Sequence, residues 1–203
     1  QKGIYSVEKF LIARRLMYWQ VYLHKTGLVA ENILVNILKR AKELSEKEEH
    51  LYASSALSYF LKNQISSNNF SDTTLQMFSK LDDFDILSAI KEWTNHSDKV
   101  LSQLSKIMVD RKLLKIEIQK NPFTEQKLSK IKSKFSKKID ISEANIKYFV
   151  FTREIRNQAY QSEKPIYILS KKGKLKDIAK ASDQLNLQAL TKPVIKHFIC
   201  YPK

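Results

Sequence analysis

Hydrophobic positions in the first half of the chain repeat with the period of an α-helix. Val29, Ile33, Ile37 and Leu44, for example, recur at helical spacing. The pattern predicts six helices, which cover residues 7–24, 28–44, 48–64, a short stretch after Ser71, 82–93 and 98–109. Ser6, Ser71 and Ser97 are the expected N-caps. Thr26 and Gly27 are expected to form a turn or kink between the first two helices.

The pattern changes after residue 110. The segment "RKLLKIEIQ", residues 111–119, alternates like a β-strand, and a helical period returns over residues 124–138. Further strands are expected at 145–153, 164–171 and 194–201, whereas 174–182 is ambiguous. The predicted fold class is therefore α+β. We expect an all-helical region at 1–110 and a smaller, basic α+β lobe at 111–203.

Size and composition limit the class of protein. The chain has 203 residues, 43% of them hydrophobic, which is enough for one substantial core or one core plus a small satellite. The sequence contains no signal-peptide pattern and no apolar run near the roughly 18 to 20 residues that cross a bilayer. Cys200 is the single cysteine, so an intrachain disulfide is excluded. These features predict a cytoplasmic protein.

Charge is distributed unevenly along the chain. The net charge is +15; residues 1–100 carry 13 Lys/Arg against 12 Asp/Glu, and residues 101–203 carry 23 against 9. The asymmetry indicates anionic partners such as nucleic acid, nucleotides or a membrane surface. A solvated, lysine-rich surface encoded by an AT-biased genome explains the same numbers equally well.

The first predicted helix carries a candidate phosphate site. Arg14, Tyr18 and Tyr22 are four residues apart and share one helix face. A guanidinium donates bidentate, charge-assisted hydrogen bonds to phosphate oxygens, and a tyrosine adds a hydroxyl and a flat surface for a sugar or base. A neighbouring apolar stripe could face the core: Phe10, Ala13, Met17 and Val21. The alternative is a packed core helix whose arginine extends to water.

The predicted helix at 124–138 is strongly basic. Lys127, Lys130 and Lys134, with Lys137 or Lys138, share a face opposite an apolar stripe of Leu128, Ile131 and Phe135. The helix is either a polyanion-facing surface or a simple amphipathic surface helix. Aromatic residues between the lysines are too few for a base-stacking platform.

Three segments resemble a known family. The stretch "IYSVEKFLIARRLMYWQVYLHKTGLVAENIL" resembles the helix pair downstream of the metal centre in HD-domain phosphohydrolases, above all the deoxynucleoside triphosphate (dNTP) triphosphohydrolases. "SDKVLSQLSKIMVDRKLLKIEI" is similar to a later helix of that family and its Arg-x-Leu-x-Lys strand. "GKLKDIAKASDQLNLQALTKPVIKHFICYPK" resembles the C-terminal lobe of bacterial members. The resemblance implies that the helical half continues an HD-type domain; residues 45–96 and 119–145 match only loosely.

The resemblance also implies substrate-binding residues. The position of Arg14 holds a substrate phosphate, and that of Tyr22 packs on the deoxyribose and excludes a 2′-hydroxyl. Tyr18 occupies a catalytic position near the scissile phosphate, where the family often has a histidine. Tyrosine is a weaker general acid than histidine at neutral pH, so the replacement of histidine by Tyr18 affects the proton-transfer role expected at this position.

A regulatory nucleotide site is implied as well. His24 and Lys25 match positions that line such a site between subunits, and Arg111 and Lys115 match a second part of it. Arg153 resembles a further basic position that touches the regulatory nucleotide. The implied partners are deoxynucleoside triphosphates and further copies of the chain, in a dimer or tetramer.

The family's metal set is missing from the sequence. HD phosphohydrolases use a His…His-Asp…Asp set to bind a divalent or transition metal that activates water. The four histidines here are His24, His50, His96 and His197, and none is followed by aspartate. We therefore expect no metal or other cofactor in this chain. Because the chain also begins at Gln1, close to a helix start, we expect a fragment whose metal-bearing part lies upstream and which is inactive alone.

Two functions remain open from the sequence. The leading interpretation is the C-terminal portion of an HD-family enzyme that converts a dNTP to a deoxynucleoside and triphosphate. The alternative is a non-catalytic, basic module for nucleic-acid binding or oligomerisation. Binding to nucleic acid would weaken steeply with salt, whereas a nucleotide pocket would discriminate deoxyribose from ribose.

Overall fold

The chain divides into two compact units, each assembled from separate stretches of sequence. The computed structural model describes residues 2–136, 141–157, 165–169, 173–181 and 193–203. Unit 1 combines Gln1–Leu28, Glu117–Phe123 and Thr152–Ile199, and unit 2 combines Val29–Ile116, Thr124–Phe151 and Cys200–Lys203. Both units draw on residues from either side of position 110. The predicted regions 1–110 and 111–203 therefore differ from the two compact units in extent, and the domain boundary near residue 110 stays a prediction.

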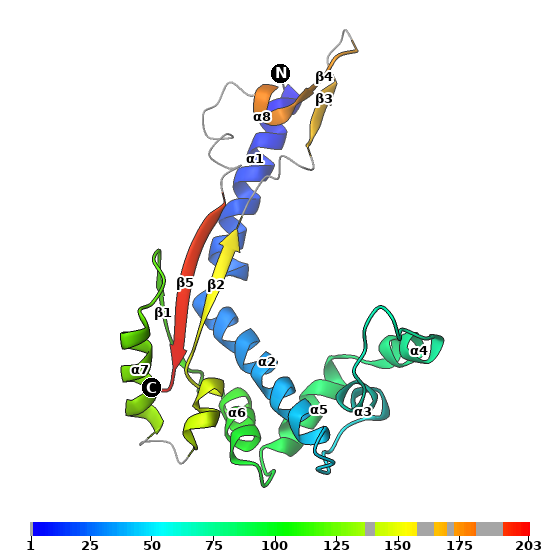
Figure 1. Cartoon of the computed structure of the whole chain (residues 1–203). Helices are drawn as coiled ribbons and strands as arrows, with labels where there is room; N and C mark the ends of the chain where they lie inside the picture. Colours follow the sequence, from blue (N-terminus) through cyan, green and yellow to red (C-terminus); the bar gives the residue numbers. More distant parts are fainter. Residues whose placement is uncertain (1, 137–140, 158–164, 170–172, 182–192) are drawn as a thin grey trace. The chain divides into compact units, whose positions relative to one another are not determined.

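The element order confirms the predicted α+β class with a helical first half (Figure 1). The first half contains α1 (Lys2–Met17), the π-helical η1 (Tyr18–Tyr22), α2 (Lys25–Ser45), α3 (Ser55–Lys62), α4 (Asp72–Lys80), α5 (Asp83–Trp93) and α6 (Lys99–Val109). The second half contains β1 (Lys115–Gln119), α7 (Glu125–Ser136), the 3-10 helix η2 (Glu143–Tyr148), β2 (Phe151–Asn157), β3 (Tyr167–Leu169), β4 (Leu175–Asp177), α8 (Ile178–Ala181) and β5 (Val194–Tyr201).

The strands form two small sheets. One has the order β1-β5-β2, so the last strand of the chain lies between two earlier ones. The other is an antiparallel pair of β3 and β4, in which Ile168 lies opposite Lys176. The strand predicted at 194–201 is confirmed, and the ambiguous stretch at 174–182 contains both β4 and α8.

The start of the first helix differs from the prediction. The helix already includes Lys2, so Ser6 lies inside it and cannot be its N-cap. Near its end the backbone widens into the π-helical segment η1, where the amide of Leu23 donates to the carbonyl of Tyr18 at 2.7 Å. Such π-turns are rare in proteins overall, but those that occur are often found at functional sites. The π-turn at η1 changes the direction of every side chain that follows.

The break between α1 and α2 lies at Leu23 and His24, slightly before the predicted turn at Thr26-Gly27. His24 directly precedes α2: its carbonyl accepts from the amide of Leu28 at 3.0 Å, and its Nδ1 accepts from the amide of Thr26 at 3.3 Å. An imidazole thus satisfies one of the amides that a helix start leaves unpaired, a role usually filled by Ser, Thr, Asp or Asn.

Helix caps elsewhere follow ordinary chemistry. The predicted cap Ser71 is confirmed, since its side chain accepts from the amide of Thr74. The predicted cap Ser97 is wrong, because Asp98 accepts from the amide of Leu101 at 2.8 Å. A carboxylate is favoured there by the positive end of the helix dipole. Asp82 caps α5 in a capping box with Asp85.

Two further element boundaries differ from the prediction. The helix expected at 48–64 begins only at Ser55, after the cap Ser54. The strand expected at 145–153 begins only at Phe151, because the preceding residues form the 3-10 helix η2. Ile146, Tyr148, Phe149 and Val150 are buried, although the backbone there is not the predicted strand, whereas Tyr52 before α3 is 53% exposed.

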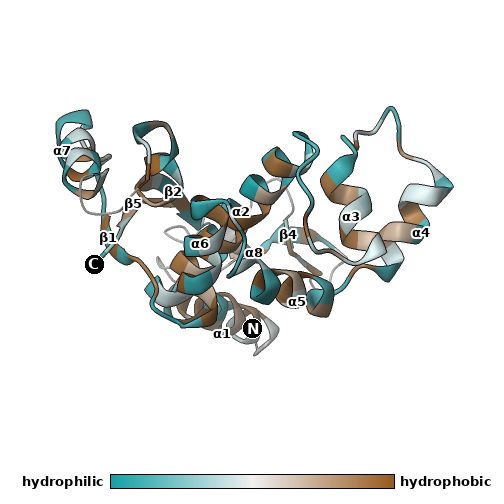
Figure 2. Ribbon diagram, turned by 90° about the horizontal axis from the view of Figure 1, so that it is seen from below, coloured by the Kyte–Doolittle hydropathy of each residue, from teal (hydrophilic) through white to brown (hydrophobic). Residues whose placement is uncertain are grey.

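Each unit has its own apolar packing. In unit 2, Val29, Ile33, Ile37 and Leu44 of α2 are buried, as the helical repeat predicted, and Figure 2 shows hydrophobic and hydrophilic residues alternating around this helix. A second cluster in unit 2 joins α7 to η2 and β5: Phe135, Ile146 and Val150, with Leu128, Ile131 and Tyr201. In unit 1, Leu11 packs on Ile178 of α8.

Among the residues that the structure describes, no helix combines the length and the hydropathy that crossing a bilayer requires.

Candidate functional site

The three substrate-binding residues predicted on the first helix form one row in unit 1. The guanidinium carbon of Arg14 lies 5.6 Å from the centre of the Tyr18 ring, and the Tyr18 and Tyr22 ring centres are 5.2 Å apart. Arg14 is exposed, and Tyr18 and Tyr22 are 36% and 59% exposed. The arginine–tyrosine row therefore presents a cation and two phenols at the surface of this chain, rather than in its core.

The apolar stripe beside that row is not the core face. Phe10, Met17 and Val21 are 60%, 49% and 59% exposed, and Ala13 is exposed as well, so this expectation is wrong. The core face instead carries Leu11, which packs against Ile178. The helix is apolar on most sides, so spacing alone could not select the face that meets α8. An arginine and phenols next to exposed apolar groups suit a ligand with anionic and hydrophobic parts.

A cavity of about 560 Å³ lies in the same unit. We call it the lysine pocket, and it is lined by Trp19, Leu23, His24, Lys25, Ile118, Gln119, Lys120, Ile155 and Lys196. Its volume is in the range of small-molecule sites, roughly 300 to 1,000 Å³. Three ammonium groups and one imidazole line it, and no carboxylate is among these described lining residues. The electrostatics favour an anionic ligand.

The pocket is built from segments far apart in sequence. Trp19 and Leu23 come from the π-helical segment and the break that follows it, and His24 directly precedes Lys25, the first residue of α2. Ile118 and Gln119 end β1, and Lys120 follows it. The buried Ile155 of β2 contributes an apolar surface. Lys196 of β5 lies with its Nζ 4.0 Å from the centre of the Trp19 ring. This cation–π contact holds one positive charge over an aromatic face.

His24 has a defined hydrogen-bonding role at this site. Its Nδ1 accepts the amide of Thr26, so a neutral imidazole carries its proton on Nε2. That N–H is then the group that His24 can donate to a ligand oxygen. The next residue, Lys25, adds an ammonium in the first turn of α2, where the helix dipole also favours negative charge.

The other residues of the predicted regulatory site lie outside the pocket lining. Arg111 is exposed and has a left-handed φ of 57° in the turn after α6. The Nζ of Lys115 lies 5.5 Å from the Tyr201 ring centre in unit 2, and Arg153 donates to the carbonyl of Thr152. That these residues act together with His24 and Lys25 stays a prediction.

Sequence reasoning missed several residues of the pocket. Trp19 was visible only as part of an aromatic run, and Lys120 only as one of many lysines. Lys196 lies in an apolar strand with no local signal of function. Trp19, Lys120 and Lys196 line the pocket together only because β1 and β5 fold beside the end of the first helix. Residue spacing within a single segment cannot predict such a contact between distant segments.

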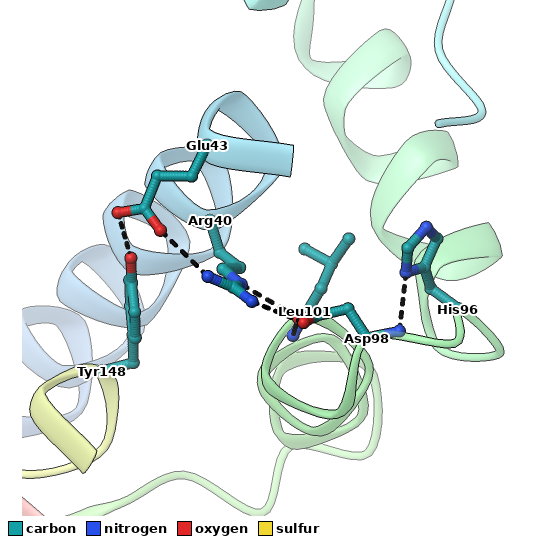
Figure 3. Close-up of polar contacts among 6 residues, drawn as sticks. All are labelled: Arg40, Glu43, His96, Asp98, Leu101 and Tyr148. Atoms are coloured by element: carbon teal, nitrogen blue, oxygen red, sulfur yellow. Dashed lines mark hydrogen bonds and ion pairs between the residues drawn. The ribbon is translucent and has the colours of Figure 1, made fainter. Parts of the chain in front are cut away.

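A second polar constellation lies in unit 2 (Figure 3). Arg40 forms a bidentate ion pair with Asp98, with Nε to Oδ1 at 3.0 Å and Nη2 to Oδ2 at 2.6 Å. Arg40 also pairs with Glu43 at 3.1 Å, and the Tyr148 hydroxyl donates to the other Glu43 oxygen. The amide of Asp98 in turn donates to Nδ1 of His96. These contacts connect α2 with the start of α6 and with η2.

The titration of this network indicates a structural role. Burial and the hydrogen bond to Glu43 raise the pKa of Tyr148 to about 12. Burial opposes ionisation of Asp98 and Glu43, but their hydrogen bonds from Arg40, and from Tyr148 to Glu43, outweigh it and hold both pKa values below their usual range. Since none of the three groups changes protonation near neutral pH, the network is poorly suited to acid–base catalysis.

Metal ligands were sought among the described residues. No group of three or more His, Cys, Asp or Glu side chains in that part of the chain is arranged to hold a metal ion. A metal therefore does not fit the side chains that the structure describes.

Comparison with known proteins places the fold among phosphohydrolases. No protein-family model matches the chain. A crystal structure of a phosphohydrolase from Bacteroides thetaiotaomicron is 44% identical, with a TM-score of 0.89, and the match covers 100% of this chain and 51% of the other. The uncharacterized protein YwfO of Bacillus subtilis is 26% identical over 190 residues, which are 90% of this chain and 41% of that protein.

The chain thus spans about half the length of the solved structure and less than half of the curated relative. Identity of 44% over the whole chain, with a TM-score of 0.89, shows that it shares the fold of the matching half of that phosphohydrolase.

Proposed function

We propose that this chain is part of an HD-family nucleotide phosphohydrolase and contributes the side chains that bind the phosphates and the sugar. The reaction we propose for the parent is hydrolysis of a deoxynucleoside triphosphate to the deoxynucleoside and triphosphate. The observation that carries the proposal is the exposed arginine–tyrosine row in a chain 44% identical to a phosphohydrolase. The substrate class rests on the resemblance of the first helix to the dNTP branch.

Each side chain of the row has a proposed task. Arg14 donates two parallel hydrogen bonds to non-bridging phosphate oxygens, which fixes the triphosphate. Tyr18, beside it, donates its hydroxyl to the phosphate that reacts, and it orients this group rather than acting as the main proton donor. Tyr22 covers the deoxyribose with its ring and fills the space that a 2′-hydroxyl would need.

A metal ion would activate the attacking water in the parent. Since the described residues offer no group of metal ligands, we assign the metal ion to residues of the parent protein other than these. By the same reasoning, we expect the 203 residues alone to bind nucleotide without turning it over.

The lysine pocket supports a second, regulatory nucleotide site. Three ammonium groups, an imidazole N–H and a tryptophan ring are the groups that bind a triphosphate and a base. We assign His24 and Lys25 to it, as the resemblance implies, and add Lys120 and Lys196. Arg111, Lys115 and Arg153 are proposed to complete it from another subunit of a dimer or tetramer.

Binding measurements test the substrate site. Titration calorimetry with dGTP and GTP is carried out on the wild-type chain, Arg14→Ala and Lys9→Ala, which removes an exposed cation from the same helix. Loss of a charged hydrogen bond costs about 1.5 to 3 kcal/mol, so Arg14→Ala is expected to weaken dGTP binding at least tenfold. Lys9→Ala is expected to bind as the wild type does.

A further variant tests the sugar contact. Tyr22→Ala is expected to reduce the preference for dGTP over GTP, because it removes the ring that excludes the 2′-hydroxyl. If Arg14→Ala and Lys9→Ala bind dGTP equally well, the phosphate role of Arg14 is wrong.

A further inference from the structure

Helix α7 in unit 2 carries a row of lysines along one flank. Lys127, Lys130 and Lys134 are all exposed and lie within about 60° of one another around the helix, at 100° per residue. A rise of 1.5 Å per residue places them over about 10.5 Å of helix length. We call these three residues the α7 lysine row. Lys137 and Lys138, predicted to continue it, lie outside the described residues.

The remaining charges of α7 lie on the opposite flank. Glu125 and Lys132 are separated from each residue of the row by about 140° to 180° around the helix. Between the two flanks the helix exposes Gln126, Ser129 and Ser133, which are small or uncharged hydrogen-bonding groups. Figure 2 accordingly shows α7 mainly in the hydrophilic and intermediate colours. The row is therefore a positive strip without a carboxylate from its own helix.

The apolar face of α7 is already occupied. Leu128, Ile131 and Phe135 pack against Ile146, Val150 and Tyr201 in the second cluster of unit 2. A helix that binds a membrane surface must place an apolar face among the lipids. Because α7 uses that face in the protein, its exposed flank offers charge and hydroxyl groups.

Aromatic contacts extend the positive strip to a second element. The Nζ of Lys134 lies 5.7 Å from the Phe135 ring centre, the Phe135 and Tyr201 ring centres are 5.8 Å apart, and the Nζ of Lys115 lies 5.5 Å from Tyr201. Cation–π contacts of this kind restrain long side chains that would otherwise lose rotamer freedom on binding. Lys115 at the start of β1 thus adds a fourth ammonium to the surface.

We propose that the α7 lysine row, with Lys115, binds the phosphodiester backbone of nucleic acid without reading its sequence. Each strand of a duplex presents one phosphate per about 3.4 Å of axis, so the row can contact several phosphates at once. Serine hydroxyls and lysine ammonium groups are ordinary partners of phosphate oxygens, and they carry no base specificity. A free nucleotide needs an enclosing cavity, whereas this surface is the open flank of a helix.

Salt-dependent binding to DNA tests the proposal on the full chain. Fluorescence anisotropy with a labelled 20-base-pair duplex is measured from low to moderate KCl. The test variant is Lys127→Gln/Lys130→Gln/Lys134→Gln. The control is Lys62→Gln/Lys80→Gln/Lys91→Gln, which removes the same charge from exposed lysines in the last turns of α3, α4 and α5.

The expected result is specific to the row. Each lost phosphate contact reduces the magnitude of the slope of log K against log salt by about 1. The slope of the test variant is therefore expected to be smaller in magnitude by about 2 to 3, and its affinity at low salt at least tenfold lower. The control keeps the wild-type slope, and a duplex of scrambled sequence binds equally well. Far-UV circular dichroism and thermal melting of both variants are expected to match the wild type.

Several results would overturn the proposal. The first is equal binding by the test and control variants. The second concerns competition by millimolar inorganic triphosphate. If triphosphate displaces the duplex from the wild type but not from a Lys25→Gln/Lys196→Gln variant, the duplex binds in the lysine pocket. The third is loss in the test variant of binding to vesicles of 30% phosphatidylserine and 70% phosphatidylcholine while duplex binding remains, which would indicate a membrane surface.

Discussion

At the scale of single residues, Arg40 of unit 2 connects two carboxylates. It binds both oxygens of Asp98 and one oxygen of Glu43, and the other Glu43 oxygen accepts from the Tyr148 hydroxyl. The Asn36 amide reaches the backbone carbonyl of Tyr148 at 2.9 Å. The side chains of Arg40 and Asp98 are only 11% and 15% exposed, so removing either one leaves the other's charge largely buried and without its bidentate partner, which is costly even where the intact pair contributes little.

Asp98→Asn tests this point. The variant keeps an N-cap oxygen for α6 but leaves the Arg40 guanidinium with Glu43 as its only carboxylate partner of the network, so we expect a loss of about 2 kcal/mol in the free energy of unfolding, measured in urea. Asp110→Asn is the control, because its partner Lys112 is 81% exposed and such pairs contribute about 0 to 1 kcal/mol. Similar losses in both variants would contradict a structural role for the Arg40 network.

Tyr148 provides a second residue-scale prediction, at alkaline pH. Its pKa in the folded protein is about 12, above the ordinary 10.0. A raised folded pKa means that the stabilisation is complete below about pH 10 and is lost as the pH rises toward 12. The melting temperature of Tyr148→Phe should therefore fall less than that of the wild type over this window. A parallel fall in both proteins would show that the Tyr148–Glu43 contact does not depend on the phenol proton.

Single residues also show what the sequence could and could not reveal about the site. Arg14, Tyr18 and Tyr22 were grouped correctly on one face because helical spacing brings positions four apart together. Trp19 and Lys196 could not be paired, since 177 positions separate them and their contact depends on the fold. The Arg40–Asp98 pair was missed for the same reason.

At the scale of elements, caps and π-turns decide where the helices begin, end and point. The helices α2, α4, α5 and α6 lie where their apolar repeats predicted them. The sequence pattern placed the starts of α1 and α3 several residues away from the observed ones. Helix ends depend on which of several neighbouring Ser, Asp or Asn side chains reaches a free amide, and apolar periodicity says little about that choice.

Two serine variants test the observed caps. Ser71→Ala is expected to lower the free energy of unfolding by about 1 kcal/mol, because Ser71 accepts from the amide of Thr74. Ser97→Ala should change it by less than about 0.5 kcal/mol, because Asp98 caps α6 instead. Urea denaturation of both proteins gives the comparison, and a larger loss for Ser97→Ala would contradict the assigned cap.

Deletion of Gln20 tests the π-helical segment. Removing one exposed residue from η1 allows an ordinary α-helical ladder in place of the wider π-turn and shifts Leu23 and His24 along the helix axis relative to α1. We expect the far-UV circular dichroism to be retained and dGTP binding at the lysine pocket to weaken at least tenfold. Binding equal to that of the wild type would show that the π-turn does not position His24 for the ligand.

At the scale of the whole molecule, charge and length bear on function together. The chain carries a net charge of +15, and the described cationic groups lie in a pocket, on a helix flank and beside two tyrosines. It matches about half of a phosphohydrolase of known structure. The fold class was predictable because the apolar period changes near residue 110. The composition of the two compact units was not, since each unites distant segments through long-range contacts.

Product analysis of the longest natural protein that carries this chain is the most direct test. The protein is incubated with dGTP and a divalent metal, and the products are identified by phosphorus NMR. The account predicts inorganic triphosphate from the wild type, strong loss of it in Arg14→Ala, and full retention in Lys9→Ala. Release of monophosphate or diphosphate instead of triphosphate, or an Arg14→Ala protein as active as the wild type, would contradict it.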